Sequence, residues 1–261
     1  MRGTKTPKAI RADHNLNRGR AGAGRHDGPS MLTLNIAQKI AIWAIPVIFA
    51  ITLHEVAHGL VAYRLGDPTA KMVGRLTLNP LRHVDPIGTI AVPLLMLVLP
   101  GGFLFGWAKP VPIGVRNLRN PHRDMALVGV AGPLANFLMA IFWALVVRLG
   151  SGLLTSAPQI GEPVALAGVA GVFINVILMV FNLLPLPPLD GGRVLSSLLP
   201  PHLSAKFDRI EPFGLLIIVA LLLTGVLNVV LSPVMLVCMH FFSLFAGISA
   251  GGFFTLLQAL M

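Results

Sequence analysis

The sequence predicts an all-α polytopic membrane protein, and properties of the whole chain lead to this fold class. Of the 261 residues, 55% are hydrophobic and only 11% are charged, and the mean hydropathy is +0.79. Soluble domains carry about a quarter charged residues, so this composition argues against a water-soluble globule. The apolar residues also gather in long runs, several of which reach the roughly 20 residues that a spanning helix needs.

The distribution of charge supports the same class. Lys and Arg outnumber Asp and Glu by 20 to 10, a balance that also suggests nucleic-acid binding. However, seven of the basic residues lie in the first thirty positions, and most of the others lie in two loops between apolar runs. This pattern is typical of a membrane protein with cytoplasmic loops, so we expect the lipid bilayer and no nucleic acid as partner. The single cysteine, Cys238, excludes a disulfide scaffold and a Cys-rich metal cluster.

The chain divides into a tail and one domain. Residues 1–30 are rich in Arg, Gly and Pro without apolar periodicity, so we expect a disordered basic tail. We expect residues 31–261 to form a single membrane-embedded domain, with a core over about 36–200 and accessory helices over about 212–258. Its apolar runs, in chain order, are 36–63, 88–105, 124–148, 164–184, 212–231 and 233–258.

The run at 88–105 differs from the other five, because Pro93, Pro100, Gly101 and Gly102 interrupt it. Irregular backbone at membrane depth is tolerated only where it is buried in protein or lines a cavity. The sequence therefore predicts five to six transmembrane helices, with a re-entrant or β-hairpin segment after the first of them.

The first run contains a candidate metal site, His54-Glu55-Val56-Ala57-His58. Residues four apart share one face of a helix, so both imidazoles can reach one ion, and the neighbouring Glu55 points at its open position. A catalytic zinc site holds its ion through three protein ligands and keeps one place for water. The alternative is that these polar residues are hydrogen-bonded between helices, which is costly inside the membrane without a compensating ion.

The segment 182–193 offers a third ligand, Asp190. Three prolines before it prevent a regular helix, and two glycines directly after it free the backbone. A rigid non-helical segment that presents one carboxylate fits a metal ligand. The alternative is a cytoplasmic cap that follows a helix.

Taken together, these motifs resemble the site-2 protease family of intramembrane zinc metalloproteases. The resemblance covers about 36–200 and rests on the apolar HExxH helix, on Gly132-Pro133-Leu134-Ala135-Asn136 and on the N-x-x-P…L-D-G segment at 182–191. The most similar form is the compact bacterial one without PDZ or CBS domains, to which Gly106-Trp107-Ala108-Lys109-Pro110-Val111-Pro112 is also similar.

The resemblance implies a role for each matching residue. His54, His58 and Asp190 bind one Zn2+ per chain, and Glu55 is the general base. Asn182, eight residues before Asp190, helps to hold the substrate or the developing oxyanion, and Asn136 is carried over with the same role. For the Gly-Pro motif before Asn136, close helix packing is an equal alternative. His83 and Asp85 either pair with each other or approach the site.

The sidedness of the site follows from its ligands. His54 and His58 lie late in their helix and Asp190 follows the end of its own, so the two helices must run in the same direction to share one ion. With 88–105 returning to its own side, eight Lys/Arg over 64–123 and three over 185–211 share one face, against Lys39 and Arg148 on the other. The positive-inside rule then places the active site nearer the cytoplasmic face of the cell membrane, although the basic tail contradicts this orientation.

The resemblance implies an intramembrane zinc metalloendopeptidase that cuts transmembrane proteins, as in regulated intramembrane proteolysis. The alternatives are a zinc-binding membrane transporter and a non-catalytic protease-like scaffold. Transporters commonly show two related halves with paired broken helices, which this sequence does not. For an enzyme, the apolar-polar alternation that ends 72–78 predicts an edge strand that pairs with an unwound substrate segment.

Overall fold

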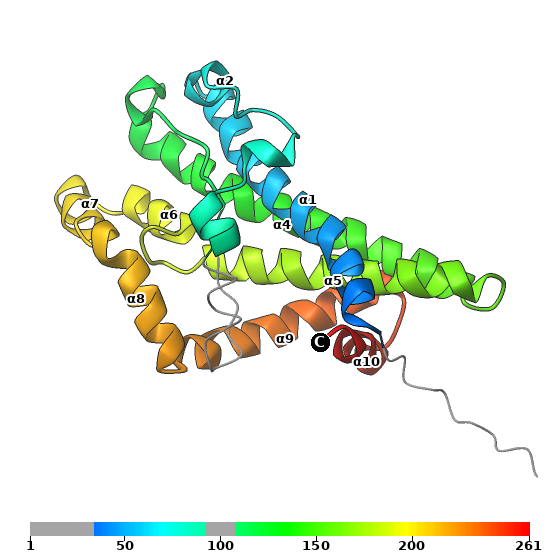
Figure 1. Ribbon diagram of the computed structural model, residues 1–261. Helices are drawn as coiled ribbons and strands as arrows, with labels where there is room; N and C mark the ends of the chain where they lie inside the picture. The colour runs from blue at the N-terminus through cyan, green and yellow to red at the C-terminus, as the bar shows by residue number, and fades with distance from the viewer. Residues whose placement is uncertain (1–33, 92–107) are drawn as a thin grey trace, which may run out of the picture. The chain divides into compact units, whose positions relative to one another are not determined.

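The computed structural model of the protein describes residues 34–91 and 108–261, and within them the secondary structure is helical, without a strand. Four described helices are long and apolar enough to cross a membrane: α1 (Ile36–Arg64), α4 (Pro121–Leu153), α5 (Pro158–Asn182) and α9 (Val226–Ala246) (Figure 1). Two apolar helices are shorter, α8 (Glu211–Leu223) and α10 (Ala250–Leu260). The predicted class, an all-α polytopic membrane protein, is confirmed. The expected tail over 1–30 and most of the run 88–105 lie outside the described residues.

The helix α1 begins at a reciprocal cap. The side chain of Asn35 accepts a hydrogen bond from the backbone of Gln38, and the side chain of Gln38 accepts one from the backbone of Asn35, both at 2.9 Å. Such a capping box satisfies two of the amide groups that a helix start leaves unpaired. The helix then continues for 29 residues through Pro46, so its polar residues His54, Glu55 and His58 lie in its second half.

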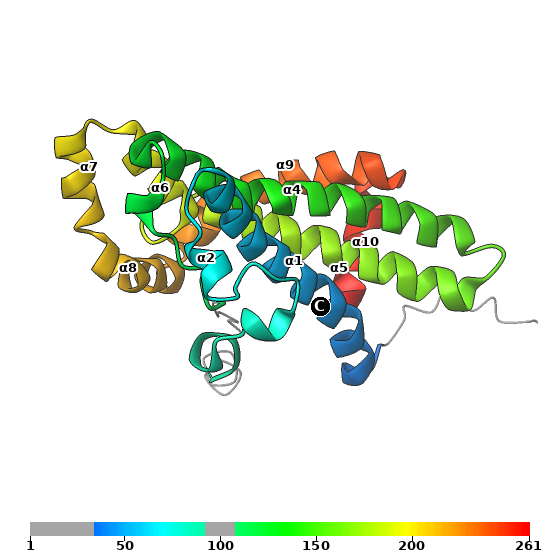
Figure 2. The ribbon, with the colours of Figure 1, turned by 90° about the horizontal axis from the view of Figure 1, so that it is seen from above.

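The helices α1, α4 and α5 pack as consecutive antiparallel neighbours. Contacts between α1 and α4 pair Ala50 with Asn136 and His58 with Val128, so residue numbers rise in one helix as they fall in the other. The α4 and α5 helices form a hairpin joined by a short turn (Figure 2), in which Gly150 lies against Ala165. Because both pairs are antiparallel, α1 and α5 run in the same direction, as expected if His54, His58 and Asp190 share one ion.

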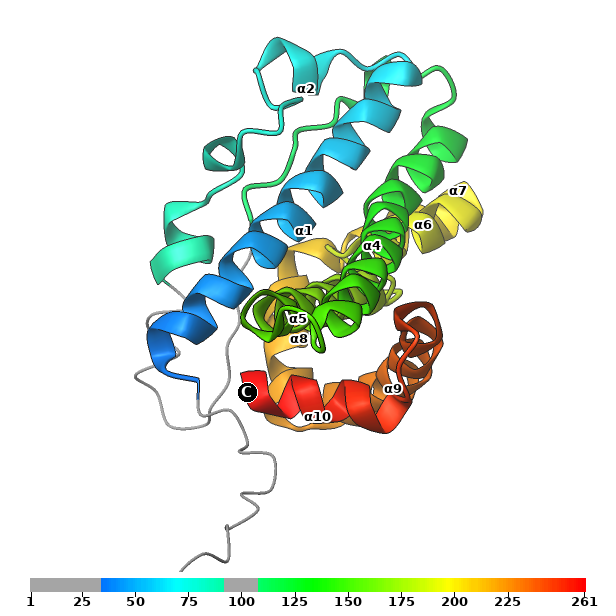
Figure 3. The same cartoon turned by 90° about the vertical axis from the view of Figure 1, so that its right-hand side faces the viewer.

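The hydrophobic core lies where α4, α5, α9 and α10 meet. The last two helices lie against α5 on the side away from α1 (Figure 3). Close contact of α4 and α5 depends on small residues, because a β-carbon at Gly171 would lie 2.2 Å from the indole ring of Trp143. The largest fully buried apolar side chains of this core are Phe242, Phe253, Leu166, Val147, Val169, Val172 and Val176.

The chain leaves α1 and enters α4 at the same end of these two antiparallel helices. The described residues between them form only short elements: α2 (Thr69–Met72), η1 (Pro80–Arg82), η2 (Pro86–Ala91) and η3 (Val115–Asn117). The β-hairpin expected in this segment is not seen in its described part, and the re-entrant path falls mostly on residues outside it.

The prediction of an edge strand over 72–78 is wrong. The helix α2 extends to Met72, and Gly74 then adopts the left-handed conformation, with φ 66°. The backbone N–H of Arg75 closes this turn by donating to Ala70, at 2.8 Å, as at many helix C-termini. The alternating residues therefore follow a helix end and form bends.

The last two apolar runs also divide at other places than expected. The breaks fall at Gly225 and Gly247, which have φ of 74° and 68°, whereas Pro233 lies inside α9. A glycine in the left-handed conformation ends a helix, while a proline in a membrane helix is tolerated when its neighbours satisfy the freed backbone.

Candidate metal centre

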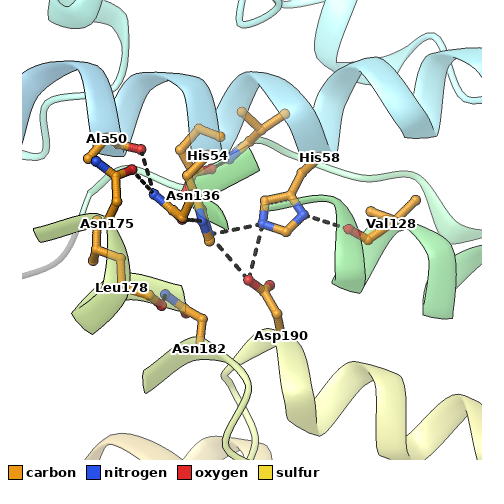
Figure 4. A network of polar contacts seen from close by, with 11 residues as sticks. Ala50, His54, His58, Val128, Asn136, Asn175, Leu178, Asn182 and Asp190 are labelled. Atoms are coloured by element: carbon orange, nitrogen blue, oxygen red, sulfur yellow. Dashed lines mark hydrogen bonds and ion pairs between the residues drawn. The ribbon is translucent and has the colours of Figure 1, made fainter. Parts of the chain in front are cut away.

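Three buried side chains from two distant parts of the chain converge on one point (Figure 4). His54 and His58 lie one helical turn apart on α1, and Asp190 is the first residue of α6 (Asp190–Leu198). The two imidazole Nε2 atoms are 3.1 Å apart, and each lies 3.2 Å from Oδ2 of Asp190. Among the described residues, this is the one group of three or more His, Cys, Asp or Glu side chains arranged to hold a metal ion.

Each imidazole is oriented by an acceptor on its other nitrogen. Nδ1 of His58 lies 2.7 Å from the backbone carbonyl of Val128, and Nδ1 of His54 lies 2.5 Å from Oδ1 of Asn136. A carbonyl only accepts hydrogen bonds, so Nδ1 of His58 carries the proton, and the geometry at Asn136 assigns the same tautomer to His54. The Nε2 atoms, which face Asp190, are therefore the nitrogens that would bind a metal ion.

The donor set fits a zinc ion. Two imidazole lone pairs and a carboxylate oxygen face one another, and Oδ2 of Asp190 is buried without a hydrogen-bond donor among the described residues. Atoms that bind a tetrahedral zinc ion at about 2.0–2.1 Å lie about 3.3 Å from one another. The separations of 3.1–3.2 Å here are close to that value.

Gly132 keeps the space beside the two imidazoles open. A β-carbon at this position would lie 2.3 Å from Nε2 of His58 and 2.7 Å from Nε2 of His54. These lengths approach that of a zinc–nitrogen bond, about 2.0–2.1 Å, so any side chain here would compete with a bound ion. Together with Val128 and Asn136, Gly132 forms a stripe of α4 at four-residue spacing that faces α1.

Asp190 is held in place by the tight link between α5 and α6. A β-carbon at Gly191 would lie 2.3 Å from the carbonyl oxygen of Leu183, so the chain folds back on itself there with no room for a side chain. On the other side, a β-carbon at Gly129 would lie 3.1 Å from the carbonyl oxygen of Asp190. The two glycines let α6 approach α4 closely enough for its first side chain to reach the imidazoles.

The side chain of Glu55 is half-buried and does not belong to the three-residue cluster. Its Oε2 accepts a hydrogen bond from the backbone N–H of Val111, at 2.8 Å. This bond attaches the segment after residue 108 to the helix that carries both histidines. Oε1 has no hydrogen bond to another described residue.

The two candidate asparagines differ in their surroundings. Asn136 is fully buried, and its amide is engaged at both ends: Oδ1 faces His54, and Nδ2 donates to Asn175 at 2.9 Å and to Ala50 at 3.3 Å. Asn182 is half-buried at the end of α5, where its Nδ2 donates to the carbonyl of Leu178, at 2.9 Å. A donor for a substrate is therefore more readily found at Asn182 than at Asn136.

Three contributors to the site were not predicted from the sequence. These are the Val128 carbonyl, the empty space at Gly132 and the buried amide of Asn175. A signal existed only for Asn175, the one polar residue between Pro163 and Phe181 of an otherwise apolar helix. His83 lies outside the cluster and donates from Nε2 to the carbonyl of Thr77, at 2.9 Å.

The fold and the site together define a membrane-embedded metalloenzyme, and comparison with known proteins identifies its family. The family model of peptidase family M50 matches residues 42–225. Because this match covers more than half of the chain, the protein belongs to peptidase family M50, the site-2 protease family. The recognition made from the motifs is confirmed: the protein is a zinc metalloprotease.

Curated relatives agree with this assignment. The chain is 40% identical over 194 residues to the "Putative zinc metalloprotease YwhC" of Bacillus subtilis (strain 168), which covers 73% of this chain and 84% of that protein. It is 33% identical over 183 residues to the "Putative zinc metalloprotease Rip2" of Mycolicibacterium smegmatis, covering 69% and 66%. The protein of the same name from Mycobacterium tuberculosis (strain H37Rv) is 31% identical over 193 residues, covering 72% and 68%. No solved structure matches the chain.

Proposed function

We propose that this metalloprotease hydrolyses peptide bonds within or near the transmembrane segments of membrane proteins, with one zinc ion held by His54, His58 and Asp190. The observation that carries the proposal is the position of the cluster: both histidines belong to a helix long and apolar enough to span the membrane. A membrane protein is the substrate class that meets a site at such a position.

In the proposed reaction, Glu55 and Asn182 have separate roles beside the zinc ion. When bound, zinc supplies a Lewis acid that polarises a peptide carbonyl and makes water nucleophilic near neutral pH. Glu55 is the general base: its Oε1 takes a proton from the attacking water and later delivers one to the leaving amine. Asn182 supplies an amide donor to the substrate carbonyl once it releases the carbonyl of Leu178.

We further propose that the site lies nearer the cytoplasmic face of the cell membrane. The end of α1 that carries His58 is followed by residues 64–123 with eight Lys/Arg, and α5 is followed at the same end by residues 185–211 with three. Apart from the first thirty residues, the opposite end has only Lys39 and Arg148. Loops that carry most of the Lys and Arg residues favour the cytoplasmic side of the membrane.

The test compares zinc content and cleavage of a single-span substrate in detergent for the wild type, Glu55→Gln and Asp190→Ala. The carbonyl oxygen of the introduced glutamine amide can still accept from the backbone N–H of Val111, so Glu55→Gln removes the base and keeps the loop attached. We expect about one zinc per chain in the wild type and in Glu55→Gln, with cleavage lost in the variant. Asp190→Ala is expected to lose both cleavage and most of its zinc.

Glu211→Gln is the matched control, because it removes an exposed carboxylate at the start of α8. It is expected to retain zinc and activity. Cleavage by Glu55→Gln at the wild-type rate would exclude Glu55 as the base, and zinc unchanged in Asp190→Ala would exclude the third ligand. A zinc-loaded wild type that does not cleave a single-span membrane protein would reject the proposed substrate class.

A further inference from the structure

A line of buried amides crosses three helices and ends at a metal-binding imidazole (Figure 4). Nδ2 of Asn175 on α5 donates to the carbonyl of Gly171, at 2.8 Å, and its Oδ1 accepts from Nδ2 of Asn136 on α4, at 2.9 Å. Oδ1 of Asn136 in turn faces Nδ1 of His54 on α1, at 2.5 Å. Both asparagines are completely buried, so no solvent competes for these bonds.

Two backbone carbonyls give this line a direction. An amide has one accepting and one donating end, whereas a carbonyl only accepts. The carbonyl of Gly171 therefore accepts a hydrogen bond from the NH2 group of Asn175. The oxygen of Asn175 then accepts one from Asn136. The carbonyl of Ala50, 3.3 Å from Nδ2 of Asn136, favours the same orientation. The oxygen of Asn136 must then face His54.

The direction of the line decides which nitrogen of His54 carries the proton. An oxygen opposite Nδ1 requires Nδ1–H, so Nε2 keeps its lone pair for the metal. If the amide of Asn136 turned over, its NH2 group would face Nδ1, the proton would move to Nε2, and the ligand would be lost. His58 does not depend on such a relay, because the backbone carbonyl of Val128 orients it directly.

We propose that Asn175 is a positioning residue of the metal centre: through Asn136 it holds His54 in the tautomer whose Nε2 binds zinc. This inference rests on the proposed ligand set. Its test must therefore distinguish a failure of the role of Asn175 from a failure of the ligand set. Asn175 does not touch the metal position, and an apolar residue would suit its place in an apolar helix better. Burying an amide in an apolar helix costs free energy, and the orientation of His54 gives a reason for an amide at this position.

The experiment measures zinc affinity by competition with a chelator in detergent. Asn175→Leu keeps the approximate size of the side chain and removes its acceptor, and we expect zinc binding about 10- to 100-fold weaker, as for other residues that orient metal ligands. The same substitution is then made in the Asn136→Asp background. A carboxylate offers His54 an acceptor in either orientation, so Asn175→Leu should change zinc affinity little there.

Ser243→Ala is the matched control, because Ser243 is equally buried on α9 and its hydroxyl donates to its own helix at His240, 2.7 Å away. We expect it to bind zinc as the wild type does. Equal loss of affinity from Asn175→Leu in both backgrounds would show that Asn175 acts through packing alone and would overturn the proposal. Unchanged affinity in Asn175→Leu would overturn it as well. A wild type without zinc would instead reject the ligand set itself.

Discussion

At the scale of single residues, Gly132 contributes to the site because it has no side chain. The Gly-Pro pair was equally compatible with mere helix packing, and the structure shows packing against particular atoms, the two Nε2 atoms of His54 and His58. The asparagine four residues later faces Nδ1 of His54 from the same side of α4. The motif therefore combines open space beside the two Nε2 atoms with orientation of the His54 imidazole.

Gly132→Ala tests this role. Its β-carbon would lie within 2.3–2.7 Å of both Nε2 atoms. We expect zinc affinity to fall by about 10-fold or more and cleavage to fall with it, measured by chelator competition and substrate cleavage. Gly152→Ala on the same helix is the control, since nothing lies within 4 Å of its β-carbon. Wild-type zinc affinity in Gly132→Ala would show that the space is not needed.

At the scale of elements, two carboxylates attach the segment before α4 to the region at the end of α1. Glu55, within α1, accepts a hydrogen bond from Val111. Asp67, just after the end of α1, accepts hydrogen bonds from the turn at 114–117. Asp67 is completely buried and accepts from the backbone N–H of Gly114 at 2.6 Å, from Nδ2 of Asn117 at 2.9 Å and from the hydroxyl of Thr69. The segment is therefore ordered by side chains of α1 and its following turn.

The protonation of Asp67 makes this attachment dependent on pH. Burial raises the pKa of Asp67, but its hydrogen bonds with Thr69, Asn117 and Gly114 lower it by more, so the net pKa is below its ordinary value. A carboxylate of this kind stabilises the fold above its unfolded-state pKa of about 3.9, and the contribution is lost as the pH falls through the lower folded-state value.

Asp67→Asn is expected to lower the free energy of unfolding by about 1–3 kcal/mol near neutral pH, because every orientation of the amide sets its NH2 group against a donor. Thermal unfolding in detergent between about pH 3 and pH 7 measures it. The difference in Tm between wild type and variant should be constant above about pH 5 and shrink as the pH falls below about 3.9. A difference in Tm that does not change with pH would contradict the assignment.

At the scale of the whole molecule, the antiparallel order of α1, α4 and α5 accounts for the site. One helix between two parallel ones brings the late part of α1 and the end of α5 to the same end of the bundle. Asp190 then follows α5 at the depth of His54 and His58. The same order leaves the turn at 154–157 at the opposite end.

This arrangement predicts which loops a membrane-impermeant thiol reagent reaches in intact cells. In a Cys238→Ser background, Thr155→Cys lies in the exposed turn between α4 and α5, and Ala205→Cys lies exposed in α7 (Pro201–Asp208). We expect labelling of Thr155→Cys in intact bacterial cells and labelling of Ala205→Cys only after permeabilisation. Retained cleavage activity confirms that both proteins are folded, and the reverse pattern of labelling would invert the proposed orientation.

The sequence by itself determined the features that depend on local geometry. The apolar runs define spanning helices through their length, and the four-residue spacing of His54 and His58 places both on one face because a helix turns every 3.6 residues. The prolines and glycines around Asp190 likewise act within their own segment. Where a local signal was ambiguous, the prediction failed: alternation at 72–78 follows a helix end at Gly74, and the breaks at Gly225 and Gly247 were missed.

Only the tertiary structure decided which distant groups surround His54, His58 and Asp190. His54 and Asn136 are 82 residues apart along the chain, and Asn136 and Asn175 are 39 residues apart. Their contact depends on how three helices pack, and no periodicity within one helix reports the rotation of its neighbours. For the same reason, the sequence alone does not reveal the empty space at Gly132 or the acceptor at Val128, because both depend on how α4 packs against α1.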